Sequence, residues 1–322
     1  MSNAKVKITP EIIAVASQKG GVAKTTTAVN LASCLADYGK KVLLIDLDPQ
    51  GHCGRATGFD PELLKRTSYD LFFHPQDPKK LIRRTSYKNF DLITSNYKLA
   101  SLELDMLAKK ITPDYGDLKD TVKILSEGYE YVLIDCPPSV SYLTINALAS
   151  STSVLIPVQC EYFALEAVSR VISAIANIQH GINPKLDILG ILLTMYDSRS
   201  RLSTEILTEA NDLFKGKVFG TPIPRTISLS ECQLKGIPIN HLRPNSKGTL
   251  AYKVLARDVM EYVKRKRKSI KKEARRPLFF CVSLFVYEHR ITEREEPVLL
   301  FYCMFIGIQY MLSSSKRRHQ HD

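Results

Sequence analysis

Residues 17–28 read "SQKGGVAKTTTA", and this stretch decides the fold. In the common phosphate-binding loop, G-x-x-x-x-G-K-[ST], backbone N–H groups surround a phosphate, a lysine reaches the outer phosphates, and a hydroxyl binds Mg²⁺. Lys24, Thr25 and Thr26 stand where the lysine and the hydroxyls belong, and an additional lysine, Lys19, opens the loop. The stretch therefore predicts a nucleotide site with one lysine more than the common loop has.

The residues on both sides of the loop have the order that such a site requires. Upstream, "IIAVAS" (12–17) is an apolar run of strand length, and downstream apolar residues recur at helical spacing from Ala28 to Leu35, before Gly39. A strand, a glycine loop and a helix point the unpaired N–H groups and the positive dipole end of the helix at the phosphates. This order favours a phosphate loop over the alternative, a glycine turn before a basic surface helix.

Ala23 stands where the common loop has its last glycine. If that position takes a positive φ, an alanine there costs roughly 1 kcal/mol or more, because its Cβ crowds the backbone. We therefore expect either a slightly strained loop or a conformation that alanine tolerates.

The composition is typical of a globular protein from a reducing compartment. With 322 residues, 44% of them apolar, the chain can form one large domain or two small ones. Its seven cysteines are scattered, odd in number and never in C-x-x-C spacing, so we expect neither a disulfide framework nor a zinc site. The first residues lack the charged start and apolar stretch of a signal peptide, and we expect a cytoplasmic protein.

The net charge of +12 is concentrated at the C-terminal end. Residues 265–322 carry 13 Lys and Arg against 6 Asp and Glu, whereas residues 1–264 carry 32 against 27. A basic run, "KRKRKSIKKEARR" (264–276), precedes fifteen largely apolar residues at 298–312, fewer than the ~20 that span a bilayer. We expect a folded domain at 1–264 and a poorly ordered extension at 265–322. The alternatives for the extension are contact with DNA, an anionic membrane or a partner, and translation past the natural end of the gene.

Apolar runs of strand length alternate with helical patterns along the first 264 residues. Most of these runs lack polar alternation, which is typical of strands that are covered on both faces. We therefore expect an α/β fold with a mostly parallel central sheet flanked by helices, and a nucleotide beyond the carboxyl ends of the strands. The expected strands are 12–17, 41–48, 90–95, 131–136, 153–159, 188–197 and 218–224, and the expected helices include 99–110, 161–180 and 203–214.

Two of the expected strands end in acidic residues. "VLLIDLDPQG" places Asp46 and Asp48 two residues apart, so in an extended segment both side chains point the same way, toward the loop. "YVLIDCPPS" ends in Asp135, and two prolines then stop the strand. An acid in that position can hold a water on Mg²⁺. Strand-end aspartates often only cap the next helix, but three of them together with the loop favour a nucleotide and metal site.

These motifs resemble those of the ParA/Soj family of deviant Walker A ATPases, part of the MinD/ParA superfamily. The family loop K-G-G-x-x-K-[ST] matches Lys19-Gly20-Gly21-Val22-Ala23-Lys24-Thr25, and "DLDPQG" (46–51) and "DCPPSVSYLTINAL" (135–148) are similar to its second and third motifs. The resemblance covers about residues 10–262, and the two prolines after Asp135 favour ParA/Soj over MinD. It implies a three-layer P-loop NTPase fold, with ATP and Mg²⁺ as cofactors.

The resemblance also implies roles for individual residues. Lys24 binds the phosphates of its own subunit's ATP, and Lys19 is the signature lysine, which reaches the phosphates bound by a dimer partner. Both are catalytic residues together with Asp48, which orients the attacking water. The implied metal set is Thr25, Asp46 and Asp135, and the implied nucleotide set is Lys19, Gly20, Gly21, Val22, Ala23, Lys24, Thr25, Thr26, Pro224 and Arg225, of which the last two lie beside the adenine.

In this family, an ATP-bound homodimer binds DNA without sequence preference, and a ParB-like centromere-binding protein stimulates slow hydrolysis. By resemblance, we expect this protein to drive chromosome or plasmid partitioning on the nucleoid. Ser228 stands where the family often has an arginine, which removes one expected phosphate contact. The alternatives are a basic face that is only solvated, and a MinD-like ATPase that positions itself on a membrane surface. The candidate DNA contacts are Arg199, Arg201, Lys215, Lys217, Lys235 and Lys247.

Overall fold

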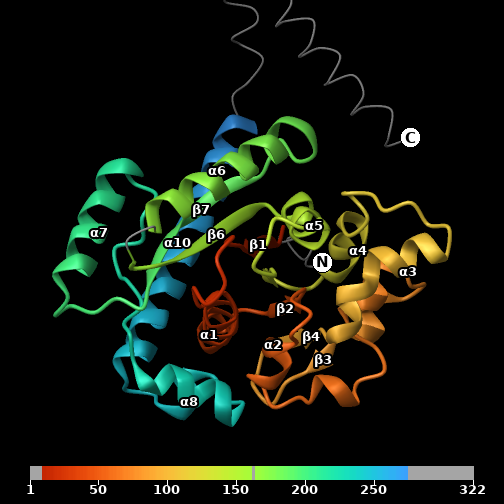
Figure 1. Ribbon diagram of the computed structural model, residues 1–322, viewed down its shortest axis with the longest axis horizontal. Helices are drawn as coiled ribbons and strands as arrows, with labels where there is room; N and C mark the ends of the chain where they lie inside the picture. Colours follow the sequence, from red (N-terminus) through yellow and green to blue (C-terminus); the bar gives the residue numbers. More distant parts are fainter. Residues whose placement is uncertain (1–8, 162–163, 275–322) are drawn as a thin grey trace, which may run out of the picture. The chain divides into compact units, whose positions relative to one another are not determined.

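The computed structural model describes residues 9–161 and 164–274 (Figure 1). The chain divides into a compact unit, Met1–Lys264, and a second unit, Arg265–Asp322. Within the described ranges, no helix has the length and apolar character needed to cross a bilayer. Most of the C-terminal extension, including its apolar stretch at 298–312, lies outside those ranges, so the expectations for it stay predictions.

A sheet of seven strands, counted over the described residues, forms the centre of the first unit. Its strand order is β3-β4-β2-β5-β1-β6-β7, and every neighbouring pair is parallel except β3 and β4. The parallel order brings the carboxyl ends of β2, β5 and β1 side by side at one end of the sheet. The strands are β1 (Glu11–Val15), β2 (Val42–Asp46), β3 (Arg83–Arg84), β4 (Phe90–Ile93), β5 (Tyr131–Asp135), β6 (Ser153–Gln159) and β7 (Asp187–Thr194).

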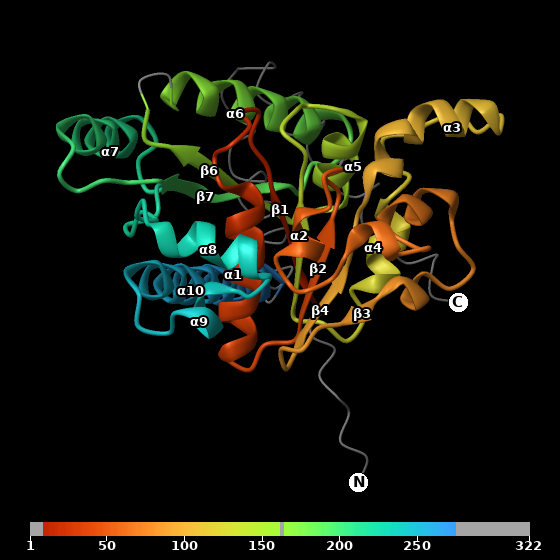
Figure 2. The same ribbon diagram turned by 60° about the horizontal axis from the view of Figure 1, so that its bottom comes forward.

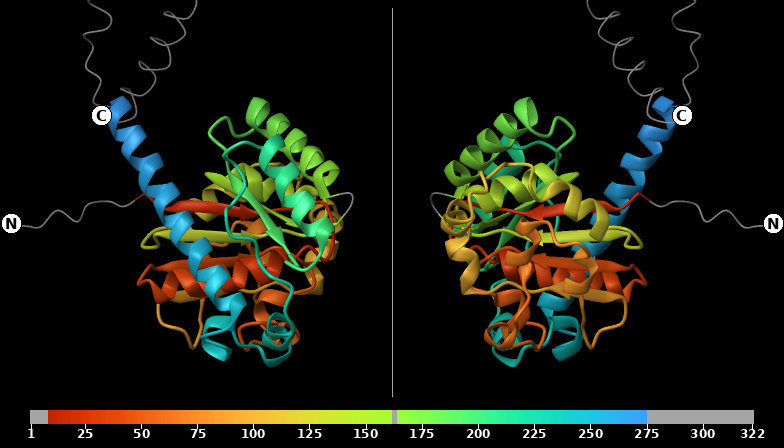
Figure 3. Two further views of the ribbon diagram at one scale, coloured as in Figure 1. Left: turned by 90° about the vertical axis from the view of Figure 1, so that its left-hand side faces the viewer. Right: turned by 90° about the vertical axis from the view of Figure 1, so that its right-hand side faces the viewer.

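Helices cover both faces of the sheet, which gives the three layers that the sequence predicts (Figure 2, Figure 3). One face packs against α1 (Lys24–Asp37), α8 (Ile227–Lys235), α9 (Ile239–Leu242) and the first part of α10 (Lys247–Ala274). The other face packs against α3 (Leu102–Ala108), α4 (Lys119–Leu125), α5 (Tyr142–Ser150), α6 (Ala164–Gly181) and α7 (Arg201–Leu213). A short helix, α2 (His52–Arg55), follows β2, and 3₁₀ turns form at Pro61–Leu63, Ser68–Phe73, Pro78–Leu81 and Tyr97–Ser101.

Side chains alternate along each strand between the two helical layers. In β1, Ile12 and Ala14 join the core on the α5–α6 face, whereas Ile13 and Val15 join the core on the α1–α10 face. Successive residues of a strand point to opposite faces, so a strand covered on both sides needs an unbroken apolar run. This is why the strands lack polar alternation in the sequence.

The structure differs from the sequence-based expectations in three places. Residues 218–224 form only isolated bridges and not a strand. The strand expected at 188–197 ends at Thr194, because Met195 has a φ of 52°, in the left-handed region. The sequence does not predict β3, since its two arginines carry no apolar pattern.

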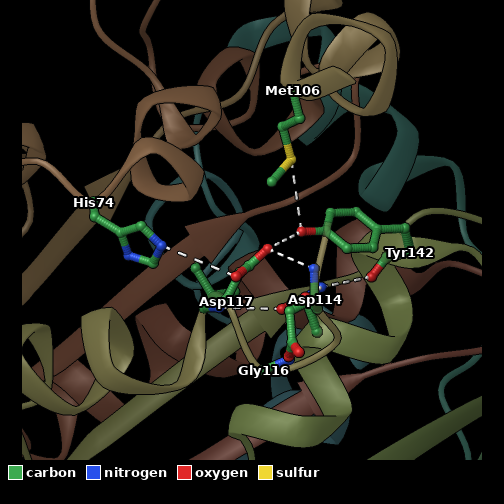
Figure 4. Close-up of polar contacts among 8 residues, drawn as sticks. His74, Met106, Asp114, Gly116, Asp117 and Tyr142 are labelled. Carbon is green, nitrogen blue, oxygen red and sulfur yellow. Dashed lines mark hydrogen bonds and ion pairs between the residues drawn. The ribbon is translucent and has the colours of Figure 1, made fainter. Parts of the chain in front are cut away.

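Asp117 holds the connection between α3 and α4 against the start of α5 (Figure 4). Its Oδ2 accepts hydrogen bonds from the Tyr142 hydroxyl and, at 2.9 Å, from Asp114 N, and its Oδ1 lies 3.9 Å from His74 Nε2. Burial and the hydrogen bond to Asp117 raise the pKa of Tyr142, so its hydroxyl stays a donor. The network fixes this connection on the face of the sheet that carries α5.

Candidate functional site

The loop and the acidic residues meet at the carboxyl ends of three adjacent strands. In the sheet register, Asp135 at the end of β5 pairs with Asp46 on β2 and with Val15 on β1, just before the loop. Thr25, the second residue of α1, donates a hydrogen bond from Oγ1 to Asp135 Oδ2 at 2.6 Å. Strand order therefore places a hydroxyl of the loop directly on one of the acids predicted for the metal site.

Two residues of the loop have a left-handed backbone. Gly21 has a φ of 76° and Ala23 has a φ of 64°. Alanine in this region costs about 1–2 kcal/mol. The positive φ expected as one possibility for Ala23 is present, and the loop is therefore strained at this residue. Lys24 then begins α1, and Ala23 O accepts a hydrogen bond from Thr27 N at 2.9 Å. The strained residue is thus the one that turns the loop into the helix.

Lys24 is buried beneath the loop, where its Nζ donates to the backbone carbonyl of Lys19 at 3.3 Å. Burial lowers the pKa of its ammonium group, and the negative charge of Asp135 opposes that shift. A buried ammonium needs an anion close by to offset its lost hydration. The phosphates of a nucleotide in front of the loop would supply that charge.

Asp46 and Asp135 are fully buried behind the loop. Asp46 accepts hydrogen bonds from the backbone N–H groups of Asp48 at 3.0 Å and of Cys53 at 3.1 Å, whereas Asp135 Oδ1 has no partner among the described residues. Burial raises the pKa of both carboxyl groups, and the charge of Asp135 adds to the shift in Asp46. Two desolvated carboxylates with one unpartnered oxygen supply the hard oxygen donors that suit Mg²⁺.

A cavity of about 530 Å³ opens in front of the loop. Asp48 lies in its wall, with Oδ1 accepting a hydrogen bond from Gln50 N at 3.0 Å. The predicted site residues that line the cavity are Gly20, Gly21, Ala23, Lys24, Thr25, Thr26, Asp48, Pro224 and Arg225. Those that lie outside its lining are Lys19, Val22, Asp46 and Asp135.

The sequence motifs assign no nucleotide-binding residue to the α8 side of the cavity. Gln233 on α8 donates from Nε2 to Thr26 Oγ1 at 2.7 Å, across 207 residues of sequence, so tertiary packing brings the two together. Arg225 is fixed by its backbone, because its N–H donates to Tyr196 O at 2.9 Å. The lining residues that sequence reasoning missed are Gln50, His52, Pro138, Met195, Ile223, Thr226, Leu229, Ser230 and Gln233.

Lys19 pairs with a carboxylate of its own chain. Its ammonium forms an ion pair with Glu161 Oε2, while Glu161 Oε1 accepts a hydrogen bond from Gln159 Nε2. The side chains of Lys19 and Glu161 are 48% and 47% exposed, and ion pairs this accessible to water contribute little energy. A more highly charged anion can therefore displace Glu161.

The cations predicted to contact DNA fall into two groups. Three of them pair with acids of the same chain, namely Arg199, Arg201 and Lys217. The other three are exposed and have no ion-pair partner within the described part of the chain, namely Lys215, Lys235 and Lys247. The second group is therefore better placed to meet phosphates without first breaking an internal pair.

Comparison with known proteins identifies the family. The family model of an AAA domain, AAA_31, matches residues 10–188. The chain is 42% identical over 249 residues to the sporulation initiation inhibitor protein Soj of Bacillus subtilis, with 77% of this chain and 98% of Soj covered. It is 39% identical over 252 residues to the chromosome partitioning protein ParA of Myxococcus xanthus, with 78% of this chain and 88% of that protein covered.

Two solved structures with bound nucleotide share the fold. Cobyrinic acid a,c-diamide synthase from Mycobacterium smegmatis, with an ATP analogue and magnesium, matches with a TM-score of 0.71 at 34% identity, over 80% of this chain and 96% of that one. The septum site-determining protein MinD of Pyrococcus horikoshii, complexed with Mg-ADP, matches with a TM-score of 0.65 at 26% identity, over 78% and 96% of the two chains. The motifs, the sheet and these relatives agree, and the chain belongs to the ParA/Soj family of partitioning ATPases.

Proposed function

We propose that residues 1–264 form a Mg²⁺-dependent ATPase domain that binds ATP in the cavity in front of the loop. The observation that carries the proposal is the hydrogen bond from Thr25 Oγ1 to Asp135 Oδ2, because it joins the phosphate loop to the buried acid pair. The buried ammonium of Lys24 and the cavity of about 530 Å³ support the same reading. When bound, Mg²⁺ neutralises charge on the phosphates and polarises the terminal one.

Each residue of the site then has a distinct task. Lys24 and the N–H groups of the loop bind the phosphates, and the Thr25 hydroxyl, Asp46 and Asp135 hold the metal and its waters. Asp48, in the cavity wall, orients the attacking water toward the terminal phosphate. Hydrolysis is slow, since a lone carboxylate activates water weakly, and a partner accelerates it by completing or tightening the site. Pro224 and Arg225 contact the adenine.

ATP joins two copies of the chain in this proposal. Lys19 lies outside the lining of its own cavity and is half exposed, so it can extend to the phosphates bound by a second copy. Phosphates and carboxylates that face each other across a dimer repel, and one ammonium group from each copy offsets that repulsion. Dimerisation would then depend on ATP.

The ATP-bound dimer binds DNA non-specifically through exposed cations, and a ParB-like partner stimulates hydrolysis and release. This cycle drives chromosome or plasmid partitioning in the cytoplasm, at the nucleoid. The proposal is supported by the names of the relatives, Soj and the chromosome partitioning protein ParA, at 42% and 39% identity. The exposed lysines Lys215, Lys235 and Lys247 supply a surface for phosphate contact.

Calorimetric titration of the full chain with ATP tests the nucleotide site. We expect binding that needs Mg²⁺ and that is lost in Lys24→Ala, but not in Lys40→Ala, whose lysine pairs with Glu130 instead. Binding that is unchanged in Lys24→Ala would overturn the proposal.

A gel shift with duplex DNA and flotation with anionic vesicles, each with ATP, test the later steps. Flotation without a gel shift would favour the MinD-like alternative.

A further inference from the structure

Cys53 contacts both of the buried acids. Its backbone N–H donates to Asp46 Oδ2 at 3.1 Å, and its Sγ donates to Asp135 Oδ2 at 3.3 Å. All three residues are fully buried, and one ligand atom from each lies within 4.8 Å of the others. The motifs of the sequence assign no role to this cysteine.

The hydrogen bonds of Asp135 are distributed unequally between its two oxygens. Oδ2 accepts from both Thr25 Oγ1, at 2.6 Å, and Cys53 Sγ, at 3.3 Å, while Oδ1 is buried and has no partner among the described residues. Rotation of the carboxylate would break both bonds, so Oδ1 keeps one direction. An oxygen that is desolvated, unpartnered and fixed in direction suits a cation or a water in its coordination shell.

The backbone before Cys53 directs the thiol toward the acids. Gly51 has a φ of 64°, and a Cβ built on it would lie 2.8 Å from Ser95 O. No other residue fits there without moving the backbone of Ser95. The chain then enters α2, whose second residue is Cys53. The position of the thiol is therefore set by a turn that the fold restricts to glycine.

We propose that Cys53 is a positioning residue for metal binding, whose thiol, together with the Thr25 hydroxyl, fixes the orientation of the Asp135 carboxylate. The inference rests on the proposed role of Asp135 in holding Mg²⁺. Removing a hydrogen bond that orients a metal ligand typically lowers metal affinity 10–100-fold, because an oriented ligand loses less freedom when the metal binds. A cysteine that only filled space would leave metal affinity unchanged when it is replaced by an apolar side chain of similar size.

Binding of Mn²⁺, a paramagnetic substitute for Mg²⁺, to the full chain with ADP can be measured by electron paramagnetic resonance. We expect Cys53→Ala to weaken Mn²⁺ binding by about tenfold. Cys53→Val, which keeps the volume without a donor, should behave in the same way, and Cys53→Ser, which keeps a donor, should recover most of the loss. Cys34→Ala, a matched change at a buried cysteine in α1, should bind Mn²⁺ as the wild type does. Thermal unfolding without metal identifies any variant that fails to fold.

The outcomes separate this inference from the proposed function. Wild-type affinity in both Cys53→Ala and Cys53→Val, together with loss of binding in Asp135→Ala, would overturn the role of Cys53 and leave the metal site standing. Undiminished Mn²⁺ binding in Asp135→Ala would overturn the metal site itself. An equal loss of Mn²⁺ affinity in Cys34→Ala would show that the effect comes from packing and not from the thiol of Cys53, and would also overturn its role. If the wild type binds Cd²⁺ more tightly than Mn²⁺, and Cys53→Ser removes this preference, the sulfur is a direct metal ligand. That result would also contradict the positioning role.

Discussion

Lys19 and Glu161 form an ion pair within one chain, across 142 residues of sequence. The backbone carbonyl of the same lysine accepts a hydrogen bond from Lys24 Nζ at 3.3 Å, so the two ammonium groups of the loop have different partners. Lys24 is buried inside the site, and Lys19 is half exposed at its rim. Two lysines in such different surroundings suit two different anions, one inside the site and one beyond it.

Replacing Lys19 with alanine tests whether that second anion belongs to another copy. We expect Lys19→Ala to bind ATP as a monomer with nearly unchanged affinity but to give no ATP-dependent dimer in analytical ultracentrifugation. Glu161→Gln is the matched control, because it removes the internal charge partner and keeps the lysine. That variant should dimerise at least as strongly as the wild type. A normal dimer in Lys19→Ala would contradict the signature role of this lysine.

Asp48→Ala should separate ATP binding from hydrolysis. Loss of the carboxylate that orients the water should slow phosphate release by about 10²–10⁴-fold, the range typical of positioned proton acceptors. The variant should still bind ATP and accumulate as a dimer on DNA. Asp120→Ala, at an exposed acid on α4, serves as the control for loss of one negative charge. Hydrolysis at the normal rate in single-turnover measurements would mean that another group positions the water.

The parts of the fold and site that local patterns encode could be predicted from the sequence. The strand before the loop, the left-handed conformation considered for Ala23, and the approach of Asp46 and Asp135 all follow from residues close in the chain or from parallel strand ends. Contacts between distant residues could not be predicted. The bond from Gln233 to Thr26 depends on how α8 packs, and no period or motif encodes that packing.

Burial, too, lies beyond what the motifs indicate. The acidic motifs predict that Asp135 lies near a metal, but they do not indicate that it is fully buried with one oxygen unpartnered. Likewise, they do not predict that Cys53 donates its thiol to that carboxylate, because a lone cysteine after a strand has no pattern of its own. The motifs thus indicate candidate residues for the site, whereas the burial and the hydrogen bonds of those residues follow from the packing around them.

Asp135→Asn should stabilise the metal-free protein. Burial raises the pKa of this carboxyl group above its unfolded value, so the ionised form opposes folding as the pH rises above about 4. Without metal, we expect the unfolding temperature to rise by about 2–4 °C at pH 8, the shift that roughly 1 kcal/mol produces in a domain of this size. The gain should shrink toward pH 5, because the wild-type carboxyl in the folded protein, with a pKa raised to about 7, is then protonated. Calorimetry that shows a destabilised variant at pH 8 would contradict this account.

Ala23→Gly should also stabilise the fold, for a different reason. Glycine removes the left-handed strain of about 1–2 kcal/mol, but it adds freedom to the unfolded chain. We expect a net gain of roughly 0.5–1 kcal/mol in the free energy of unfolding by urea. Ala36→Gly, inside α1, is the matched control and should lose stability, because glycine there is unfavourable in a helix. Equal losses in both variants would show that Ala23 is not strained.

Of the three candidate DNA contacts that are exposed and without an ion-pair partner within the described residues, Lys235 and Lys247 lie on α8 and α10, on the same face of the sheet. Each phosphate contact that is lost should reduce the slope of log affinity against log salt by about 1, so Lys235→Ala with Lys247→Ala should reduce it by about 2. The loss should be the same for unrelated DNA sequences, because phosphate contacts carry no base information. Lys119→Ala with Lys123→Ala, at two exposed lysines of α4, removes the same charge from the opposite face of the sheet. Equal slopes for the two double variants, in fluorescence anisotropy titrations with ATP, would show that net charge and not this surface governs DNA binding.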